Sequence, residues 1–212
     1  MADLGELAAA LQKPGRDTSK NVTELVQKAL DEGVNVKEVL DGGLIKGMSE
    51  LGVKFKNNEV YVPEVLIAAR AMNEAMKVLE PKLVEAGIEP VGKIVIGTVK
   101  GDLHDIGKNL VGMMFKGAGF DVVDIGIDIT PEKFVEAAKA EGVKLLGLSA
   151  LLTTTMPQMK NVVDAAKEAG ITAKIIIGGA PVTQAYADEI GADGYAPDAA
   201  SAVDVGKQLI GA

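Results

Sequence analysis

The single histidine of the 212-residue chain stands at position 104, inside the segment GDLHDIGK. Asp102 precedes it by two residues, so its carboxylate can accept a hydrogen bond from one ring nitrogen. Such a bond would fix the imidazole tautomer and leave the other nitrogen free to bind a metal ion. Asp-His pairs also serve acid-base catalysis. The pair therefore predicts either a metal site or an acid-base site.

The composition narrows the kind of metal site. The sequence holds no cysteine and no second histidine, which are the usual ligands of a hydrolytic metal. Carboxylates alone could still bind magnesium. One protein imidazole is sufficient, however, where a macrocycle supplies the remaining in-plane donors. The residues thus favour a tetrapyrrole-like cofactor over a bare ion, and the alternative is a purely structural role for His104 in its loop.

Composition and charge also exclude several classes of protein. The formal net charge is -8 and both signs are spread along the chain, so nucleic acid is not an expected partner. Without cysteine there can be no disulfide, iron-sulfur cluster or thiol nucleophile. The start MADLGELAAA lacks the basic region of a secretory signal, and no apolar run approaches the roughly 20 residues that span a bilayer. We expect a globular, cytoplasmic protein that binds no membrane.

Up to about residue 90 the apolar residues recur at helical spacing. The helical blocks are NVTELVQKAL, VKEVLDGGLIKGMSELGVKF and PEVLIAARAMNEAMKVLEPKLVEAG, with turn signals between them. A further short helix is expected near Leu4 to Gln12. No alternating β-branched stretch interrupts these blocks. Residues 1–90 are therefore predicted to form a small helical bundle.

From residue 91 onward short aliphatic runs alternate with amphipathic segments. Strands are predicted at KIVIGTV, DVVDIGI, VKLLGLSAL, AKIIIGG and ADGYA. Helices are predicted near residues 107–118, 131–141, 156–169, 181–190 and 199–210. Five β-α units predict a parallel sheet covered on both faces in residues 91–212. The fold class is α/β, and the length favours the flavodoxin-like strand order 2-1-3-4-5.

The predicted sheet brings distant residues to one rim. Ligands of open α/β sheets bind beyond the carboxyl ends of the strands, where the strand order reverses. His104 follows the first predicted strand, Ser149 ends the third, and Gly178 and Gly179 end the fourth. Three glycines could allow tight turns of the histidine loop and close approach of a ligand: Gly97, Gly101 and Gly107.

The order and spacing of these residues are typical of one family. D-x-H-x-x-G comprises Asp102, His104 and Gly107, S-x-L begins at Ser149, and G-G stands at 178–179. This pattern resembles the cobalamin-binding signature of methionine synthase and of corrinoid proteins in methyltransferase systems. The likeness covers roughly residues 20–211 and includes TVKGDLHDIGKNLVG, GLSALLTTTM, IIIGGAPVT and YVPEVLIAARAMNEAMKVLEP. Nothing resembles the barrel domains of full methionine synthases, so the chain is similar to the stand-alone carriers.

The resemblance implies a role for each residue of the motif. His104 would be the lower axial ligand of cobalt, in place of the dimethylbenzimidazole of a base-off cobalamin. Asp102 would hold the distal nitrogen of its ring, and Thr155 would supply the relay hydroxyl that is a serine in methionine synthase. The slot for the displaced nucleotide tail would be lined by Ser149, Leu151, Gly178 and Gly179. The other implied cofactor-binding residues are Gly101, Asp105, Ile106, Gly107 and Thr153, with Tyr61, Val62 and Leu66 above the ring.

The resemblance also implies an activity and partners. The chain would accept a methyl group on cob(I)alamin from a substrate held by a partner methyltransferase. It would pass that group to a second methyltransferase for a folate or thiol acceptor, and a reductive activase is a further expected partner. Residues 1–90 would form the cap and residues 91–212 the cobalamin-binding domain. The carrier would not be catalytic alone, and its donor could be methanol, a methylamine, glycine betaine or a methoxylated aromatic compound.

Three other interpretations share part of this pattern. A cobalamin-binding subunit of an adenosylcobalamin-dependent mutase carries the same motif, but a separate catalytic barrel caps it, which the attached helical region disfavours. A cobalamin-dependent sensor or regulator would need a basic recognition helix, whereas residues 1–90 hold 11 Lys and Arg against 15 Asp and Glu. The third is a flavodoxin-like signalling domain without a corrinoid.

Overall fold

The computed structural model describes residues 3–13 and 15–212. Its backbone separates into two compact units. The first unit comprises Met1–Pro90 with Gly117–Gly119, and the second comprises Val91–Lys116 with Phe120–Ala212. Each unit has its own internal packing.

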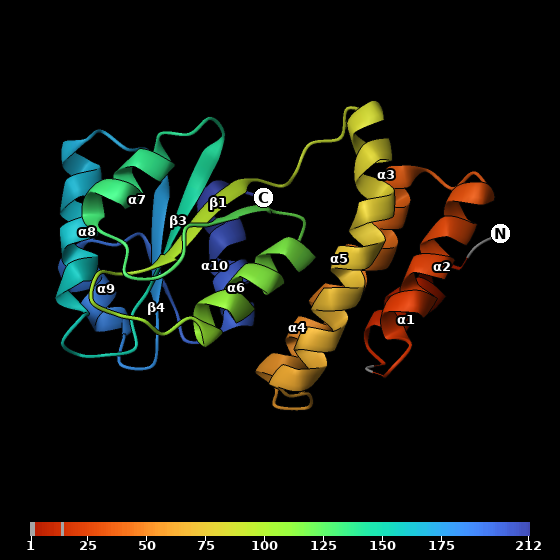
Figure 1. Ribbon diagram of the computed structural model, residues 1–212, viewed down its shortest axis with the longest axis horizontal. Helices are drawn as coiled ribbons and strands as arrows, with labels where there is room; N and C mark the ends of the chain where they lie inside the picture. Colours follow the sequence, from red (N-terminus) through yellow and green to blue (C-terminus); the bar gives the residue numbers. More distant parts are fainter. Residues whose placement is uncertain (1–2, 14) are drawn as a thin grey trace. The chain divides into compact units, whose positions relative to one another are not determined.

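The first unit is helical, as the periodicity predicted (Figure 1). Helix α2 packs along α5, while α1 packs against η1 and α4. The elements are α1 (Leu4–Leu11), α2 (Thr18–Asp31), α3 (Val36–Glu38), the π-helical segment η1 (Val39–Ile45), α4 (Lys46–Lys56) and α5 (Val62–Glu85).

Glycines set the spacing between α1 and the helices beneath it. A side chain on Gly47 would meet the carbonyl oxygen of Ala8 at 2.8 Å, and one on Gly43 would strike the side chain of Leu7. The backbone of α1 can approach this closely only because both positions lack a Cβ atom. The helical block predicted from VKEVLDGGLIKGMSELGVKF therefore packs on α1 through Gly43 and Gly47. Part of this block forms the wider π-helical segment η1.

Local hydrogen bonds define where α5 begins. The carboxylate of Glu64 accepts a hydrogen bond from the backbone N–H of Tyr61 at 2.6 Å, which satisfies a donor outside the helical ladder. Pro63 follows in the first turn, where a missing N–H costs nothing. Tyr61 is thereby held at the helix start with its side chain outward, since 67% of the residue surface is exposed.

The second unit is built on a parallel sheet of five strands in the order β2-β1-β3-β4-β5. This confirms the predicted flavodoxin-like order. The strands are β1 (Lys93–Thr98), β2 (Asp121–Asp124), β3 (Val143–Ser149), β4 (Lys174–Gly178) and β5 (Gly194–Ala196). Thr98 pairs with Ser149, and Ser149 pairs with Gly178, so β1, β3 and β4 end level with one another.

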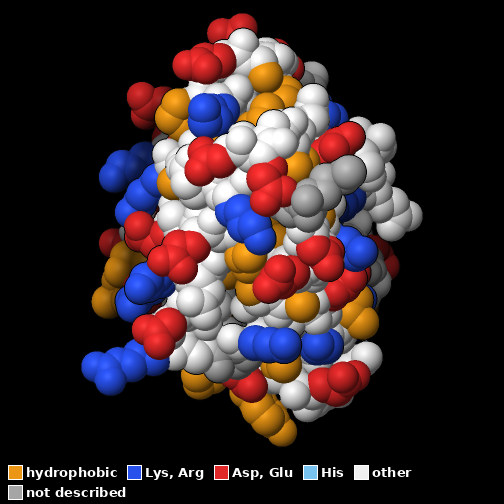
Figure 2. Space-filling view, turned by 90° about the vertical axis from the view of Figure 1, so that its right-hand side faces the viewer, with side chains coloured by type: hydrophobic (Ala, Val, Ile, Leu, Met, Phe, Trp, Pro, Cys, Tyr) orange, Lys and Arg blue, Asp and Glu red, His pale blue; other side chains and the backbone are white. Residues whose placement is uncertain are grey.

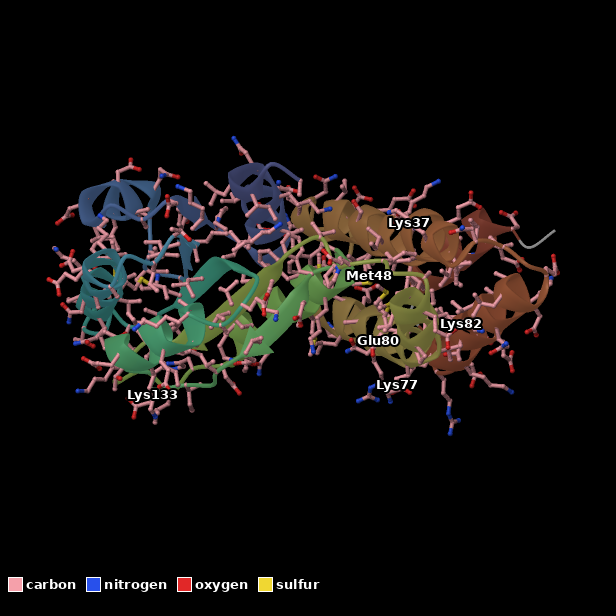
Figure 3. The ribbon with its side chains drawn as sticks, turned by 90° about the horizontal axis from the view of Figure 1, so that it is seen from above. Lys37, Met48, Lys77, Glu80, Lys82 and Lys133 are labelled. Atoms are coloured by element: carbon pink, nitrogen blue, oxygen red, sulfur yellow. The ribbon has the colours of Figure 1, made fainter. Side chains whose placement is uncertain are left out.

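Helices cover both faces of this sheet (Figure 1). They are α6 (Ile106–Gly117), α7 (Pro131–Ala138), α8 (Pro157–Glu168), α9 (Gln184–Ile190) and α10 (Ala199–Ile210). Phe134 of α7 and Met159 of α8 are buried in one cluster with Val95 of β1. The neighbour of Phe134 on α7, Lys133, is exposed and points outward (Figure 3). On the other face, Gly206 of α10 packs so closely on the ring of Phe115 that a side chain would meet it at 2.7 Å.

The surface carries charges of both signs. On the face that Figure 2 shows, Lys and Arg side chains alternate with Asp and Glu and form no continuous basic surface among the described residues. Within residues 3–13 and 15–212, no helix combines the length and the apolar character that crossing a membrane requires.

Candidate functional site

His104 lies in the loop between β1 and α6, and its imidazole is half exposed, with 51% of the side chain accessible. Ring atom Nδ1 is 2.7 Å from Oδ1 of Asp102. The other ring nitrogen, Nε2, makes no hydrogen bond to the part of the chain that the structure describes. Among those residues no cluster of three or more His, Asp and Glu side chains could hold a metal ion. The ring can therefore offer one nitrogen to a ligand, without help from a second protein donor.

Asp102 is fully buried and receives hydrogen bonds on both carboxylate oxygens. Oδ1 accepts from Nδ1 of His104 at 2.7 Å and from the backbone N–H of the same residue at 3.1 Å. Oδ2 accepts from the backbone N–H of Leu151 at 2.8 Å and from the hydroxyl of Thr155 at 2.7 Å. Two loops, one after β1 and one after β3, therefore meet at one carboxylate.

These contacts decide the charge of Asp102. Burial on its own would raise the pKa of this carboxyl, but the hydrogen bonds from His104, Leu151 and Thr155 together hold the pKa well below its usual range. An ionised carboxylate only accepts, so Nδ1 of His104 must carry the proton. The lone pair of a neutral imidazole then lies on Nε2, the exposed nitrogen.

Thr155 completes the chain of hydrogen bonds that was predicted for a relay. Its hydroxyl lies 2.7 Å from Oδ2 of Asp102 and 2.9 Å from the carbonyl oxygen of Leu152. One hydroxyl proton can serve one of these acceptors at a time, and the charged carboxylate is the stronger acceptor. Thr155 is 7% exposed, so water does not compete freely for this bond.

Two residues that the sequence interpretation missed also anchor the histidine loop. The hydroxyl of Thr98, at the end of β1, donates to the carbonyl oxygen of His104 at 2.8 Å. A carboxylate oxygen of Asp128, in the loop after β2, accepts from the backbone N–H of Gly101 at 2.7 Å. Neither residue belongs to a recognisable spacing pattern, because each contact depends on which strands are neighbours in the sheet.

The three glycines of this loop have three different explanations. A side chain on Gly97 would strike the ring of Phe134 at 2.8 Å, so this glycine lets α7 pack on the sheet. Gly101 has a φ of 81°, a left-handed conformation that other residues rarely adopt. Gly107 stands in the first turn of α6, and a Cβ there would meet nothing within 4 Å. Within the described residues, no close contact requires a glycine at position 107.

The paired glycines after β4 are required by the backbone itself. Gly179 has a φ of 132°, and a Cβ there would collide with the carbonyl oxygen of Ala150. A Cβ on Gly178 would lie 3.1 Å from the carbonyl oxygen of Ala196. Close packing of neighbouring strands is thus a sufficient reason for Gly179 and a contributing one for Gly178. Room for a nucleotide tail, which the sequence suggested, would be an additional role.

The remaining predicted residues of the second unit lie at this edge of the sheet with varied exposure. Ser149 and Gly178 are partly buried. The exposed members are Gly101, Asp105, Ile106, Gly107, Leu151, Thr153 and Gly179. The carbonyl oxygen of Asp105 accepts from the N–H of Asn109 at 2.8 Å and so begins the ladder of α6.

Large apolar side chains are exposed around the histidine. Leu103 is 67% exposed and Ile106 is 77% exposed, one on each side of His104 in the sequence. The loops after β2 and β3 add three more exposed apolar residues: Ile127, Leu151 and Leu152. Ile106 and Leu151 were predicted, whereas Leu103, Ile127 and Leu152 were missed. Such a cluster of exposed apolar side chains marks a binding surface.

The residues predicted for the helical unit lie at the start of α5. Tyr61 is 67% exposed and Leu66 is 42% exposed, while Val62 is partly buried. Tyr61 and Leu66 are therefore not part of the bundle core. Their exposure leaves them available for an external contact.

Comparison with family models matches both units. A model described as a B12 binding domain matches residues 92–204, which include the whole sheet and every loop of the site. A second model with the same description matches residues 18–80 of the helical unit.

Individual relatives match over nearly the full length. A corrinoid protein of Desulfitobacterium hafniense strain Y51 is 42% identical over 216 residues, which cover 100% of this chain and 99% of the relative. Dimethylamine corrinoid protein 3 of Methanosarcina acetivorans is 44% identical over 193 residues, 90% of each chain. Among solved structures, the methanol:cobalamin methyltransferase complex of Methanosarcina barkeri matches with a TM-score of 0.86 at 29% identity, over 98% of this chain and 79% of that one.

Proposed function

Because the chain belongs to the B12-binding family of corrinoid proteins, we propose that it carries methyl groups on a bound corrinoid with His104 below the cobalt. One observation carries the assignment of the ligand. The half-exposed imidazole has Nδ1 fixed by a buried carboxylate, and Nε2 makes no hydrogen bond to the described residues. A metal held by a macrocycle would need no second protein donor, and His104 would supply it with one nitrogen.

The residues of the second unit fit such a group. When bound, a corrinoid supplies a cobalt centre that takes up a methyl group and gives it away. Asp102 would keep the proton on Nδ1 and raise the basicity of Nε2. The apolar side chains of Leu103, Ile106 and Leu151 would lie against the ring and exclude water, and Gly107 would leave space for its edge.

The first unit is proposed to act as the cap, residues 1–90, and the second as the cobalamin-binding domain, residues 91–212. Exposed Tyr61, just before α5, and exposed Leu66 in its first turns support this role, because an apolar cap residue must be accessible to a ligand. A cap must also open when a partner protein reaches the cobalt. Val62, which is partly buried, would support Tyr61 from behind.

The proposed partners follow from the carrier role. One methyltransferase would hold the methyl donor, and a second would hold the folate or thiol acceptor. The relatives named for dimethylamine, and the likeness to a methanol-specific complex, make methylated amines and methanol the first donors to test. A reductive activase and a cytoplasmic location belong to the same proposal.

The ligand assignment is tested by reconstitution with hydroxocobalamin. The protein is labelled with ¹⁵N, because the benzimidazole of added cobalamin would itself show coupling to one ¹⁴N nucleus. After gel filtration and reduction to the Co(II) state, the paramagnetic resonance spectrum of the wild type should show hyperfine coupling to one ¹⁵N nucleus of the protein. The variant His104→Ala should retain corrinoid but lose that coupling. Asp164→Asn, on the exposed surface of α8, is the matched control and should behave as wild type. A colourless wild-type protein, a wild type that couples only to the ¹⁴N of the cofactor's own base, or ¹⁵N coupling that persists in His104→Ala would overturn the assignment.

The carrier role is tested with the donors and enzymes directly. The reconstituted and reduced protein is mixed with a dimethylamine or a methanol methyltransferase and the matching donor. The visible spectrum should change to that of the methylated corrinoid with one of the two pairs. If neither pair methylates the protein although iodomethane does, these two donors are excluded; if no form accepts a methyl group, the carrier role fails.

A further inference from the structure

We propose that Asp128 is a positioning residue that sets how firmly His104 can hold the cobalt. This inference rests on the proposed function, because it concerns the strength of the His104 ligand. Asp128 lies outside the D-x-H-x-x-G, S-x-L and G-G elements, on the loop that joins β2 to α7.

Asp128 contacts the histidine loop through both its side chain and its backbone. Its carboxylate accepts from the N–H of Gly101 at 2.7 Å, and its own N–H donates to the carbonyl oxygen of Asp102 at 3.1 Å. Two consecutive residues ahead of His104 are thus tied to one residue of another loop. The residue is exposed, so burial of its own side chain does not explain these contacts.

The backbone of Asp128 is in an uncommon conformation. Its φ is 55°, in the left-handed region, where it is one of two non-glycine residues in the part of the chain that the structure describes. Glycine would adopt this conformation at lower cost. We therefore infer that the acidic side chain has a role that glycine cannot fill. That role is to accept the hydrogen bond from the N–H of Gly101.

Two different loops hold the side chain and the backbone of Asp102. Its side chain is held by Leu151 and Thr155 of the loop after β3. Its backbone is held by Asp128 of the loop after β2. Since Asp102 orients the ring of His104, a displacement of its backbone would move Nε2 away from the position that a ligand in the site requires.

The end of β2 also fastens the far end of the histidine loop. Lys108, in the first turn of α6, has a side chain that is only 4% exposed and pairs with Asp124 at the end of β2. The other oxygen of Asp124 accepts from the N–H of Gly126 at 2.9 Å. The segment that carries His104 is therefore held at one end by the last residue of β2 and at the other by the loop that follows β2, and Asp128 is the contact nearer to Asp102.

Three substitutions separate the possible roles of Asp128. Asp128→Asn keeps an acceptor oxygen and tolerance of the left-handed conformation but removes the charge. Asp128→Gly keeps the conformation and removes the acceptor. Asp128→Ala removes the acceptor and also strains the backbone. Asp164→Asn is the control for loss of one solvent-accessible carboxylate, which pairs with Lys160 on α8.

The measurement is the midpoint potential of the Co(II)/Co(I) couple in the reconstituted proteins. Four-coordinate Co(I) holds no imidazole, so a weaker His104 ligand makes reduction easier and raises the potential. Loss of the Asp128 acceptor should weaken ligation roughly tenfold, which raises the potential by about 59 mV. We expect this rise in Asp128→Ala and Asp128→Gly, and a potential close to that of the wild type in Asp128→Asn and Asp164→Asn.

Every other pattern overturns the inference. Unchanged potentials in the alanine and glycine variants would remove the positioning role. If the potential rose in Asp128→Ala but not in Asp128→Gly, only the turn conformation would matter. If it rose equally in Asp128→Asn, the charge alone would act. Thermal unfolding of each apoprotein identifies any variant that is unfolded, and the glycine variant then serves in place of alanine. A wild type without ¹⁵N coupling would instead sink the proposed function itself.

Discussion

The two oxygens of the Asp102 carboxylate face only donors: two N–H groups of His104 on one side, and Leu151 with Thr155 on the other. An amide of the same shape has one acceptor oxygen, so its NH2 group must face N–H donors on one of these sides. A carboxylate is therefore needed at position 102 because both of its oxygens must accept hydrogen bonds, in addition to the effect of its negative charge.

Asp102→Asn should lower the free energy of unfolding of the apoprotein by about 1–3 kcal/mol, because a buried donor loses its partner. The loss would be read from urea denaturation of the apoprotein, which needs no cofactor. Asp164→Asn breaks only an exposed pair with Lys160 and should change stability by less than about 0.5 kcal/mol. Equal stability of wild type and Asp102→Asn would show that the carboxylate is not the shared acceptor.

Thr155 can be tested with two substitutions of opposite design. Thr155→Val keeps the shape and removes the hydroxyl donor to Asp102, so the apoprotein should lose about 1–2 kcal/mol of unfolding free energy. Thr155→Ser keeps the donor and loses one buried methyl group, which costs about 1 kcal/mol or less. Urea denaturation of both variants ranks them, and a serine variant less stable than the valine variant would contradict the hydrogen bond.

At the scale of helices, a glycine can be required for one of two reasons. Either a neighbouring segment packs directly against it, or a ligand needs the space that a side chain would fill. Gly47 of α4 faces the backbone of Ala8 at 2.8 Å, so an added methyl group must move α1. Gly47→Ala should destabilise the apoprotein by about 1–3 kcal/mol, even though alanine favours the helical state. Thermal unfolding measures the change, and an unchanged or raised midpoint would show that α1 does not lie against α4 in solution.

Gly107 of α6 should respond in the opposite direction. A Cβ there meets open space, so Gly107→Ala should stabilise the apoprotein by about 0.5–1 kcal/mol through helix propensity alone. The same methyl group should weaken hydroxocobalamin binding, measured by equilibrium titration of the visible spectrum. Stabilisation without any loss of affinity would show that no ligand lies against this turn.

The sequence was sufficient for the arrangement of these elements but not for every contact between them. Helical periodicity predicted the bundle and short aliphatic runs predicted the strands, because both patterns follow from local burial. The strand order was predicted from the length of the chain. Asp102 and His104 could be paired from their spacing alone. Thr155 stands 53 residues from Asp102 and could be assigned only through the family resemblance. Asp128 and Thr98 were missed, since their contacts depend on strand register that no local pattern encodes.

The π-helical η1 was also beyond prediction from periodicity. The segment spans only the 7 residues Val39–Ile45, which is too short for a separate period to stand out in the apolar pattern. The reason for Gly179 was likewise hidden, because the obstructing atom is a backbone oxygen of Ala150 on another loop. In each case the missing information is a distance between segments that are remote in the sequence.

At the scale of the whole molecule, a ligand that binds only the folded state stabilises it by mass action. The proposed site has two separable sources of such binding. One is the His104 ligand, and the other is the slot for the nucleotide tail near Ser149, Gly178 and Gly179. Cobinamide, which lacks the nucleotide tail, can use the first source alone, whereas cobalamin can use both.

At 100 times its dissociation constant, cobalamin should raise the unfolding free energy of the wild type by about 2.7 kcal/mol. His104→Ala should keep part of the stabilisation by cobalamin, because the tail still binds, and should lose a larger share of the stabilisation by cobinamide, which keeps only its contacts to the ring. Thermal unfolding with equal concentrations of each corrinoid provides the comparison, and Asp164→Asn should match the wild type with both. Cobinamide that stabilises His104→Ala as strongly as the wild type would show that His104 does not ligate the bound corrinoid, because loss of the imidazole would then cost no binding free energy.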